Sequence, residues 1–288
     1  MTWCALRTAT GGRVPRLADA AATSPPLPPE TIVSEGHLGP RYLAYLATLA
    51  LLVGLFERWD LLGGTQVVAL VIAVMLLTVV GFSVALVRAR SATDSPGQLM
   101  NYLVQVMAVA VAAAVSYLIQ DWRLHLASQA MMGVAIFSSS YVTLERFLGR
   151  ERPGHEFLMN AAAILILLGA YLSILVGTTS VPLRLVLIFA ATGLAAYELL
   201  GRVSTEQPRA VVASLIVAQI VTTVAFAMIS LQFVDNSRLA GIMLVSWYVN
   251  RDLARHLFEG TLTRNILAEY SVGLVLVAAL IASALLSR

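Results

Sequence analysis

Four carboxylates lie inside or beside long apolar segments, where a charged group is costly and is usually paired or functional. They are Glu145, Glu198, Asp252 and Glu269. Glu145 follows Tyr141 by four residues, and Glu198 directly follows Tyr197. We expect all four carboxylates at one depth near the inner membrane interface, level with several arginines, as a candidate intramembrane polar site.

Two interpretations of these carboxylates stay open. They form a functional polar layer, or they reach into the headgroup region and neutralise arginines that stop translocation. The second interpretation is the stronger one for Glu145, Glu198 and Asp252. Glu269 is the sharper case for function, because an apolar run follows it at once.

A polar stripe begins the segment that follows residue 97. Its members recur at helical spacing and are Gln98, Asn101, Gln105, Ala108, Ala112 and Ser116. Small residues let helices approach closely, and amides in hydrocarbon need partners from protein or water. The stripe therefore predicts a helix face packed against other helices, with Asn101 and Gln105 as further site candidates. A solute path along the same face is the alternative.

Several kinds of chemistry are excluded by residue type. All 19 basic residues are arginine, so a lysine Schiff base or a phosphate-binding lysine is impossible. The four histidines form no pair at helical ligand spacing, and Cys4 is the single cysteine. We expect no metal, no cofactor and no catalytic residue. Since the net charge of +3 lies on segments between apolar runs, we expect no nucleic-acid binding.

The elements that must hold these groups are transmembrane helices. The chain is 59% hydrophobic and 12% charged, against roughly a quarter charged in a soluble domain. Apolar runs near the length of about 20 residues that crosses a bilayer recur along it. The fold class we predict is an all-α polytopic bundle of nine spans, covering 42–56, 67–87, 99–119, 124–144, 157–176, 185–200, 210–231, 239–249 and 266–286.

Arginine counting sets the topology. With nine spans, 14 arginines fall on the side of the N-terminal tail and 5 on the other side. If the short eighth segment does not cross, the division becomes 12 to 7. The positive-inside bias favours nine spans in a bacterial inner membrane, with the N-terminus cytoplasmic and the C-terminus outside.

The predicted domains are a tail and a bundle. Residues 1–40 are rich in Pro, Gly and small polar residues and predict a disordered cytoplasmic tail, or alternatively an organellar transit peptide. Residues 41–288 form the transmembrane domain. Short outer connections predict four helical hairpins plus a final helix. Recurring tyrosine and arginine at the hairpin ends indicate either a repeat or ordinary interfacial residues.

Three functions are compatible with this pattern. The first is a transporter or permease with a polar site open to the cytoplasm. The second is a structural or assembly subunit that recruits anionic lipid, another membrane protein or a second copy of itself. The third, an enzyme acting on lipids within the membrane, ranks last because the sequence holds no complete catalytic set.

Overall fold

The computed structural model describes residues 64–90, 103–119, 121–147, 152–203, 207–231 and 234–286. The chain divides into two units, Met1–His37 and Leu38–Arg288, and every described residue belongs to the second. The predicted tail, the first predicted span at 42–56 and Asn101 lie outside the described residues.

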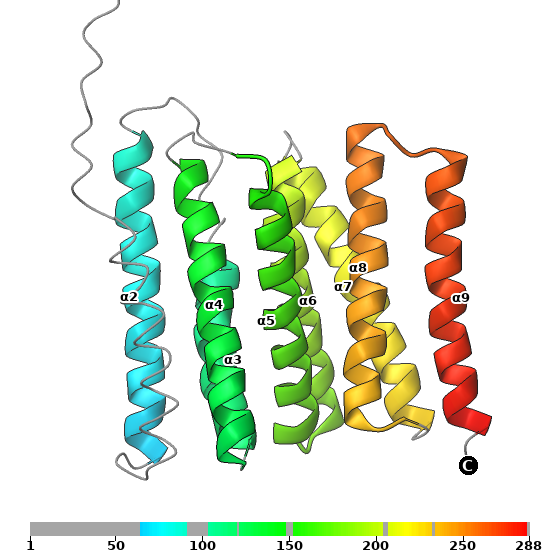
Figure 1. Cartoon of the computed structure of the whole chain (residues 1–288), viewed down its shortest axis with the longest axis horizontal. Helices are drawn as coiled ribbons and strands as arrows, with labels where there is room; N and C mark the ends of the chain where they lie inside the picture. Colours follow the sequence, from blue (N-terminus) through cyan, green and yellow to red (C-terminus); the bar gives the residue numbers. More distant parts are fainter. Residues whose placement is uncertain are drawn as a thin grey trace, which may run out of the picture. The chain divides into compact units, whose positions relative to one another are not determined.

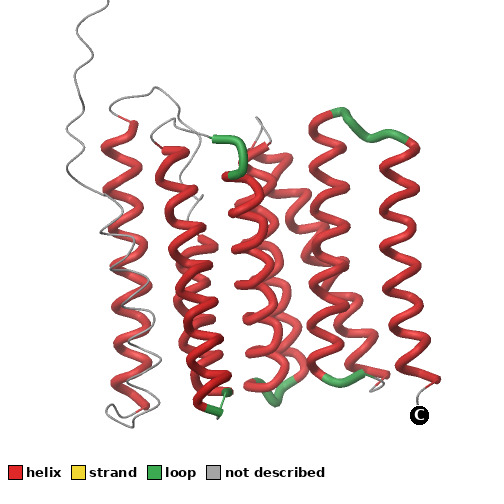
Figure 2. The backbone as a smooth tube through the Cα atoms, viewed as in Figure 1, coloured by secondary structure: helices red, strands yellow, loops and turns green. Residues whose placement is uncertain are grey.

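Every regular element within the described residues is an α-helix (Figures 1 and 2). The helices are α2 (Gly64–Arg90), α3 (Leu103–Leu118), α4 (Trp122–Phe147), α5 (His155–Gly177), α6 (Val181–Val203), α7 (Gln207–Leu231), α8 (Asn236–Glu259) and α9 (Arg264–Leu286). Each overlaps one predicted apolar segment. The all-helical fold class is confirmed for this part of the chain.

Three of these helices, α5, α6 and α7, are long and apolar enough to cross a membrane. A helix of 23 residues, such as α5 or α6, is about 35 Å long at 1.5 Å per residue, against roughly 30 Å of hydrocarbon. Large apolar side chains also stand exposed, including Phe157 at 74%, Val186 at 62% and Val212 at 57%. Lipid is the solvent that suits such a surface.

Helix α8 extends ten residues beyond its predicted apolar segment, which ends at residue 249. The helix continues because its charged last turns have partners. Arg251 donates to the Asn160 amide oxygen at 3.1 Å, and Arg255 pairs with Glu259 one turn later at 2.8 Å. A left-handed glycine, Gly260 at φ 65°, then ends the helix.

Helix α5 lies inside the packing, in contact with α3, α4, α6 and α8. Its side chains Ile166, Leu167 and Tyr171 are fully buried. The predicted packed face of α3 is confirmed over its described members, since Gln105, Ala108, Ala112 and Ser116 are all buried. Small residues on α3 and α5 let these two helices approach each other closely.

Helix α3 packs tightly against α5 at Gly169. A Cβ atom added there would lie 2.8 Å from Val111 Cγ1 and 3.4 Å from Val115 Cγ2. Gly169→Ala should therefore lower the free energy of unfolding by about 1–3 kcal/mol through overpacking. The measurement is thermal unfolding in detergent, followed by circular dichroism.

The matched control is Gly241→Ala in α8, where an added Cβ meets nothing within 4 Å. Alanine exceeds glycine in helix propensity, so this variant should be as stable as the parent or more stable. Equal melting temperatures for the two variants would show that α3 and α5 do not pack at Gly169.

Candidate functional site

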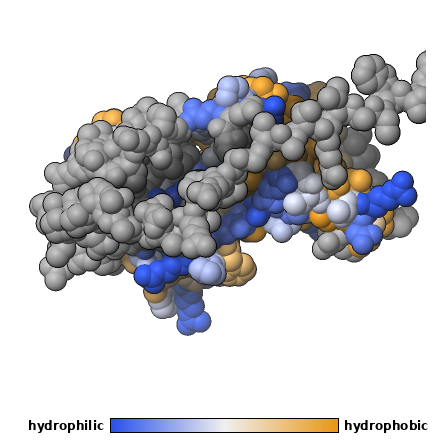
Figure 3. Space-filling view, turned by 90° about the horizontal axis from the view of Figure 1, so that it is seen from above, coloured by the Kyte–Doolittle hydropathy of each residue, from blue (hydrophilic) through white to orange (hydrophobic). Residues whose placement is uncertain are grey.

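Helices α4, α6 and α8 end, and α5 and α9 begin, at the same end of the bundle (Figure 1). Polar side chains gather there. Figure 3 is seen from above the view of Figure 1, onto this end, and hydrophilic side chains are visible on it. We call it the arginine end, after Arg146, Arg152, Arg202, Arg251 and Arg255. It holds a buried network around Glu198 and, next to it, an arginine-lined pocket.

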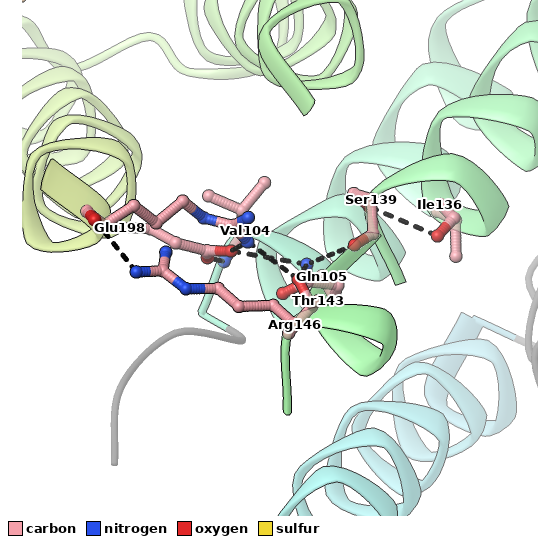
Figure 4. A network of polar contacts seen from close by, with 8 residues as sticks. Val104, Gln105, Ile136, Ser139, Thr143, Arg146 and Glu198 are labelled. Carbon is pink, nitrogen blue, oxygen red and sulfur yellow. Dashed lines mark hydrogen bonds and ion pairs between the residues drawn. The ribbon is translucent and has the colours of Figure 1, made fainter. Parts of the chain in front are cut away.

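Glu198 is fully buried on α6, at the centre of a hydrogen-bond network that joins α3, α4 and α6 (Figure 4). Oε2 accepts from the Val104 backbone N–H of α3 at 2.8 Å. Oε1 accepts from Arg202 Nη2 at 3.1 Å and from Gln105 Nε2 at 3.4 Å. Thr143 of α4 joins them, since its hydroxyl accepts from Gln105 at 2.9 Å and from Arg202 at 2.8 Å. These five residues are the Glu198 network.

The bond to Val104 gives Glu198 a capping role. Val104 lies in the first turn of α3, where N–H groups lack a carbonyl one turn earlier within the helix. The partial positive charge of a helix start also favours a carboxylate there. Glu198 thus caps α3 from another helix, a contact between residues 94 positions apart.

A second arginine ties α4 to the end of α6. Arg146 Nη2 donates to the Arg202 carbonyl oxygen at 2.9 Å. Carbonyls in the last turn of a helix lack intrahelical donors, and their negative partial charge favours a cation. Arg202 therefore lies beside Glu198, and Arg146 beside the end of α6.

The arginine-lined pocket has a volume of about 260 Å³ and lies beside this network. Its charged lining consists of Arg146, Arg152, Arg202, Arg251, Arg255 and Glu156. Two of these arginines, Arg146 and Arg202, also contact each other and the Glu198 network. We call this cavity the arginine pocket.

Arg251 is the most deeply buried of the pocket's cations, with 3% of its surface exposed. Its guanidinium lies 5.3 Å from the ring centres of both Trp247 and Tyr248, which suits cation–π attraction. Nη1 donates to Asn160 at 3.1 Å, and the nearest carboxylate oxygen, on Asp252, is 4.0 Å away. Nε and Nη2 are buried without a partner among the described residues.

Asp252 belongs to a different group of contacts between α8 and α9. It accepts a short hydrogen bond from the Tyr270 hydroxyl and lies 3.9 Å from His256. The His256 ring in turn contacts the Thr261 hydroxyl at 2.8 Å. Asp252 and Glu198 are therefore held by separate sets of partners, although both lie in the last turns of their helices.

The remaining candidates take varied positions. Tyr141 is half-buried and meets the His155 ring edge to face at 5.8 Å, beside the pocket. Tyr197 and Glu145 are half-buried and take no part in the Glu198 network. Glu269 lies on α9, and its side chain is outside the described part of the structure, as is the whole of Asn101.

Several contributors to this end were not among the predicted site residues, and three of them are Thr143, Asn160 and Arg152. Thr143 and Asn160 bind the key arginines, and Arg152 lines the pocket from the segment before α5. Thr143 lies two residues after Tyr141 and two before Glu145, so the neighbouring candidates were a usable signal. The sequence signal for Asn160 is plainer, because its amide lies inside the predicted span 157–176.

The chemistry open to this end is the binding of an anion by guanidinium groups. Within the described residues no group of three or more His, Cys, Asp or Glu side chains is placed to hold a metal ion. Comparison with known proteins finds no matching family model, no similar curated protein and no similar solved structure.

Proposed function

We propose that the chain is a multi-pass membrane protein of nine spans, arranged as four hairpins and a final helix. Packing of α3 on α4, α5 on α6 and α7 on α8 supports the hairpins. The arginine end is cytoplasmic in this proposal, in keeping with the positive-inside bias. The N-terminal tail then lies in the cytoplasm, and α9 leads to an outer C-terminus in an inner membrane.

Within that arrangement the protein acts as a transporter or permease whose polar site opens to the cytoplasm. The observation that supports this is the junction of the arginine pocket with the buried Glu198 network through Arg202. Polar groups buried within a membrane bundle commonly mark a solute or ion path. Gln105 and Glu198 are the candidates from the sequence that lie in this junction.

Arg202 is the residue through which solute and helix packing would be coupled. Its Nη2 serves Glu198 and Thr143, while its Nε is buried without a partner among the described residues. An anionic solute in the pocket would compete with Glu198 for this guanidinium. Weakening the Arg202 bond loosens the cap on α3, which provides a two-state element that the solute can bias.

The test is flux into proteoliposomes that contain the purified full-length chain. Inward gradients of a panel of small anions, cations and sugars are imposed, with a trapped pH dye reporting coupled proton movement. We expect at least one solute to move faster than in empty liposomes. Glu198→Gln combined with Glu269→Gln, the other acidic candidate from the sequence, should reduce that flux by about tenfold or more, because Glu198 is the carboxylate of the proposed path.

Glu145→Gln is the matched control, since that carboxylate is half-buried and outside the Glu198 network. Its flux should equal that of the parent. A flux that survives the double substitution unchanged would rule out the proposed path, even where transport itself is real.

An assembly subunit is the second candidate function. The observation in its favour is that the Glu198 network joins α3, α4 and α6 as an internal cross-link would. It predicts copurification with anionic lipid, another membrane protein or a second copy of this chain. A monomer in detergent that moves solute after reconstitution would exclude this alternative.

A further inference from the structure

The arginine pocket carries more positive charge than its own acids balance. Five arginines face one carboxylate, Glu156, in its lining. That carboxylate is already paired with Arg255, which also binds Glu259 at 2.8 Å. Arg202 is likewise paired with Glu198, whereas Arg251 lies no closer than 4.0 Å to a carboxylate among the described residues.

The Arg251 guanidinium is buried but only partly hydrogen-bonded. Only 3% of Arg251 is exposed, yet two of its three guanidinium nitrogens, Nε and Nη2, have no partner in the described residues. A buried charge without a hydrogen-bonded counter-charge is strongly unfavourable. Asp252 is a weak counter-charge, since its Oδ1 is 4.0 Å from Arg251 Nη1 and its other oxygen, Oδ2, accepts from the Tyr270 hydroxyl.

The start of α5 adds a further group suited to an anion. Gly154 precedes it in the left-handed conformation, at φ 97°, and no side-chain hydrogen bond caps the helix at that residue. Gly154 and His155 both line the pocket. A helix start presents backbone N–H groups and partial positive charge, which suits a phosphate oxygen.

From these contacts we infer that the arginine pocket binds a phosphate group, carried either by free phosphate or by an anionic lipid headgroup. Guanidinium forks match phosphate oxygens two at a time, which explains recruitment of arginines from α4, α6, α8 and the segment before α5. The volume of about 260 Å³ lies just below the roughly 300–1,000 Å³ of pockets for drug-sized ligands. It suits a small anion or the headgroup of a larger one.

This inference rests on the proposed function only for the further idea that the phosphate is cargo. Binding is therefore measured without flux, by calorimetry on the full-length chain in an uncharged detergent at constant ionic strength set with chloride. One arm titrates inorganic phosphate. The other titrates dihexanoyl phosphatidic acid, with dihexanoyl phosphatidylcholine as the zwitterionic comparison.

Saturable binding of inorganic phosphate identifies a free phosphate source, and binding of phosphatidic acid alone identifies a lipid. Arg251→Gln should weaken either by about 10- to 100-fold, the cost of losing hydrogen bonds to a charged group. Arg152→Gln, at the exposed lip, should weaken it by about 2- to 5-fold. Arg123→Gln removes the same charge from the start of α4 and should leave binding unchanged.

The inference is overturned if neither probe binds, or if binding tolerates both pocket substitutions. Should Arg251→Gln fail to fold, Arg152→Gln decides alone, because its exposed side chain is not needed for packing. Binding without flux keeps this inference and removes the proposed transport. Flux without binding of either probe removes this inference and keeps the proposed transport.

Discussion

Replacing Glu198 by alanine is expected to lower the free energy of unfolding by about 3–5 kcal/mol, the usual cost of removing one member of a buried ion pair. The loss has two sources. Arg202, with 13% of its side chain exposed, keeps its charge without the carboxylate, and the Val104 N–H loses its acceptor. Unfolding followed by circular dichroism in detergent measures the change.

A double-mutant cycle separates the stability contributed by the Glu198–Arg202 ion pair from that contributed by the Glu198 cap on α3. Arg202→Met removes the stranded charge, so adding it to Glu198→Ala should recover part of the loss. Glu145→Ala provides the control on a half-buried carboxylate outside the network, and it should cost less than about 1 kcal/mol. Strictly additive effects of Glu198→Ala and Arg202→Met would show that the two side chains do not interact.

Arg251→Met is expected to raise the free energy of unfolding when no ligand is bound, whereas Glu198→Ala lowers it. A buried charge without a close counter-ion carries a desolvation penalty of several kcal/mol, so exchanging it for an apolar side chain of similar length should stabilise the fold by about 1–4 kcal/mol. The loss of the 3.1 Å bond to Asn160 offsets part of that gain. The measurement is the unfolding midpoint in phosphate-free buffer.

Added phosphate should make the parent more stable than the Arg251→Met variant. A ligand that binds only the folded state stabilises it in proportion to the logarithm of its concentration over its Kd. The parent should therefore gain stability with phosphate and the Arg251→Met variant should not. Destabilisation by Arg251→Met in the absence of any anion would mean that the internal contacts of Arg251 already satisfy its charge.

The helices of this chain could be predicted closely from the sequence where the apolar runs were long. The segments predicted at 157–176 and 210–231 differ from α5 and α7 by at most three residues at either end. Burial of apolar side chains and satisfaction of the backbone inside one helix determine both, and these are local properties.

Prediction was incomplete where charges found partners far away in the chain. The eighth segment was expected to end near Asn250, but Arg251 is buried against Asn160 of α5, which lies 91 positions earlier. Likewise, Gln105 and Glu198 were both candidates, yet their contact depends on α3 packing against α6. Nothing in local periodicity specifies which helices become neighbours.

The cap that Glu198 places on α3 has a consequence for how the protein is made. During synthesis Val104 and Gln105 emerge 94 and 93 positions before their carboxylate partner. Until α6 has entered the bilayer, the first turn of α3 and the amide of Gln105 must find other partners, in water, lipid headgroups or the insertion machinery. Assembly of the arginine end is thus a late step in biogenesis, and a chain truncated before Glu198 should be a substrate for membrane quality control.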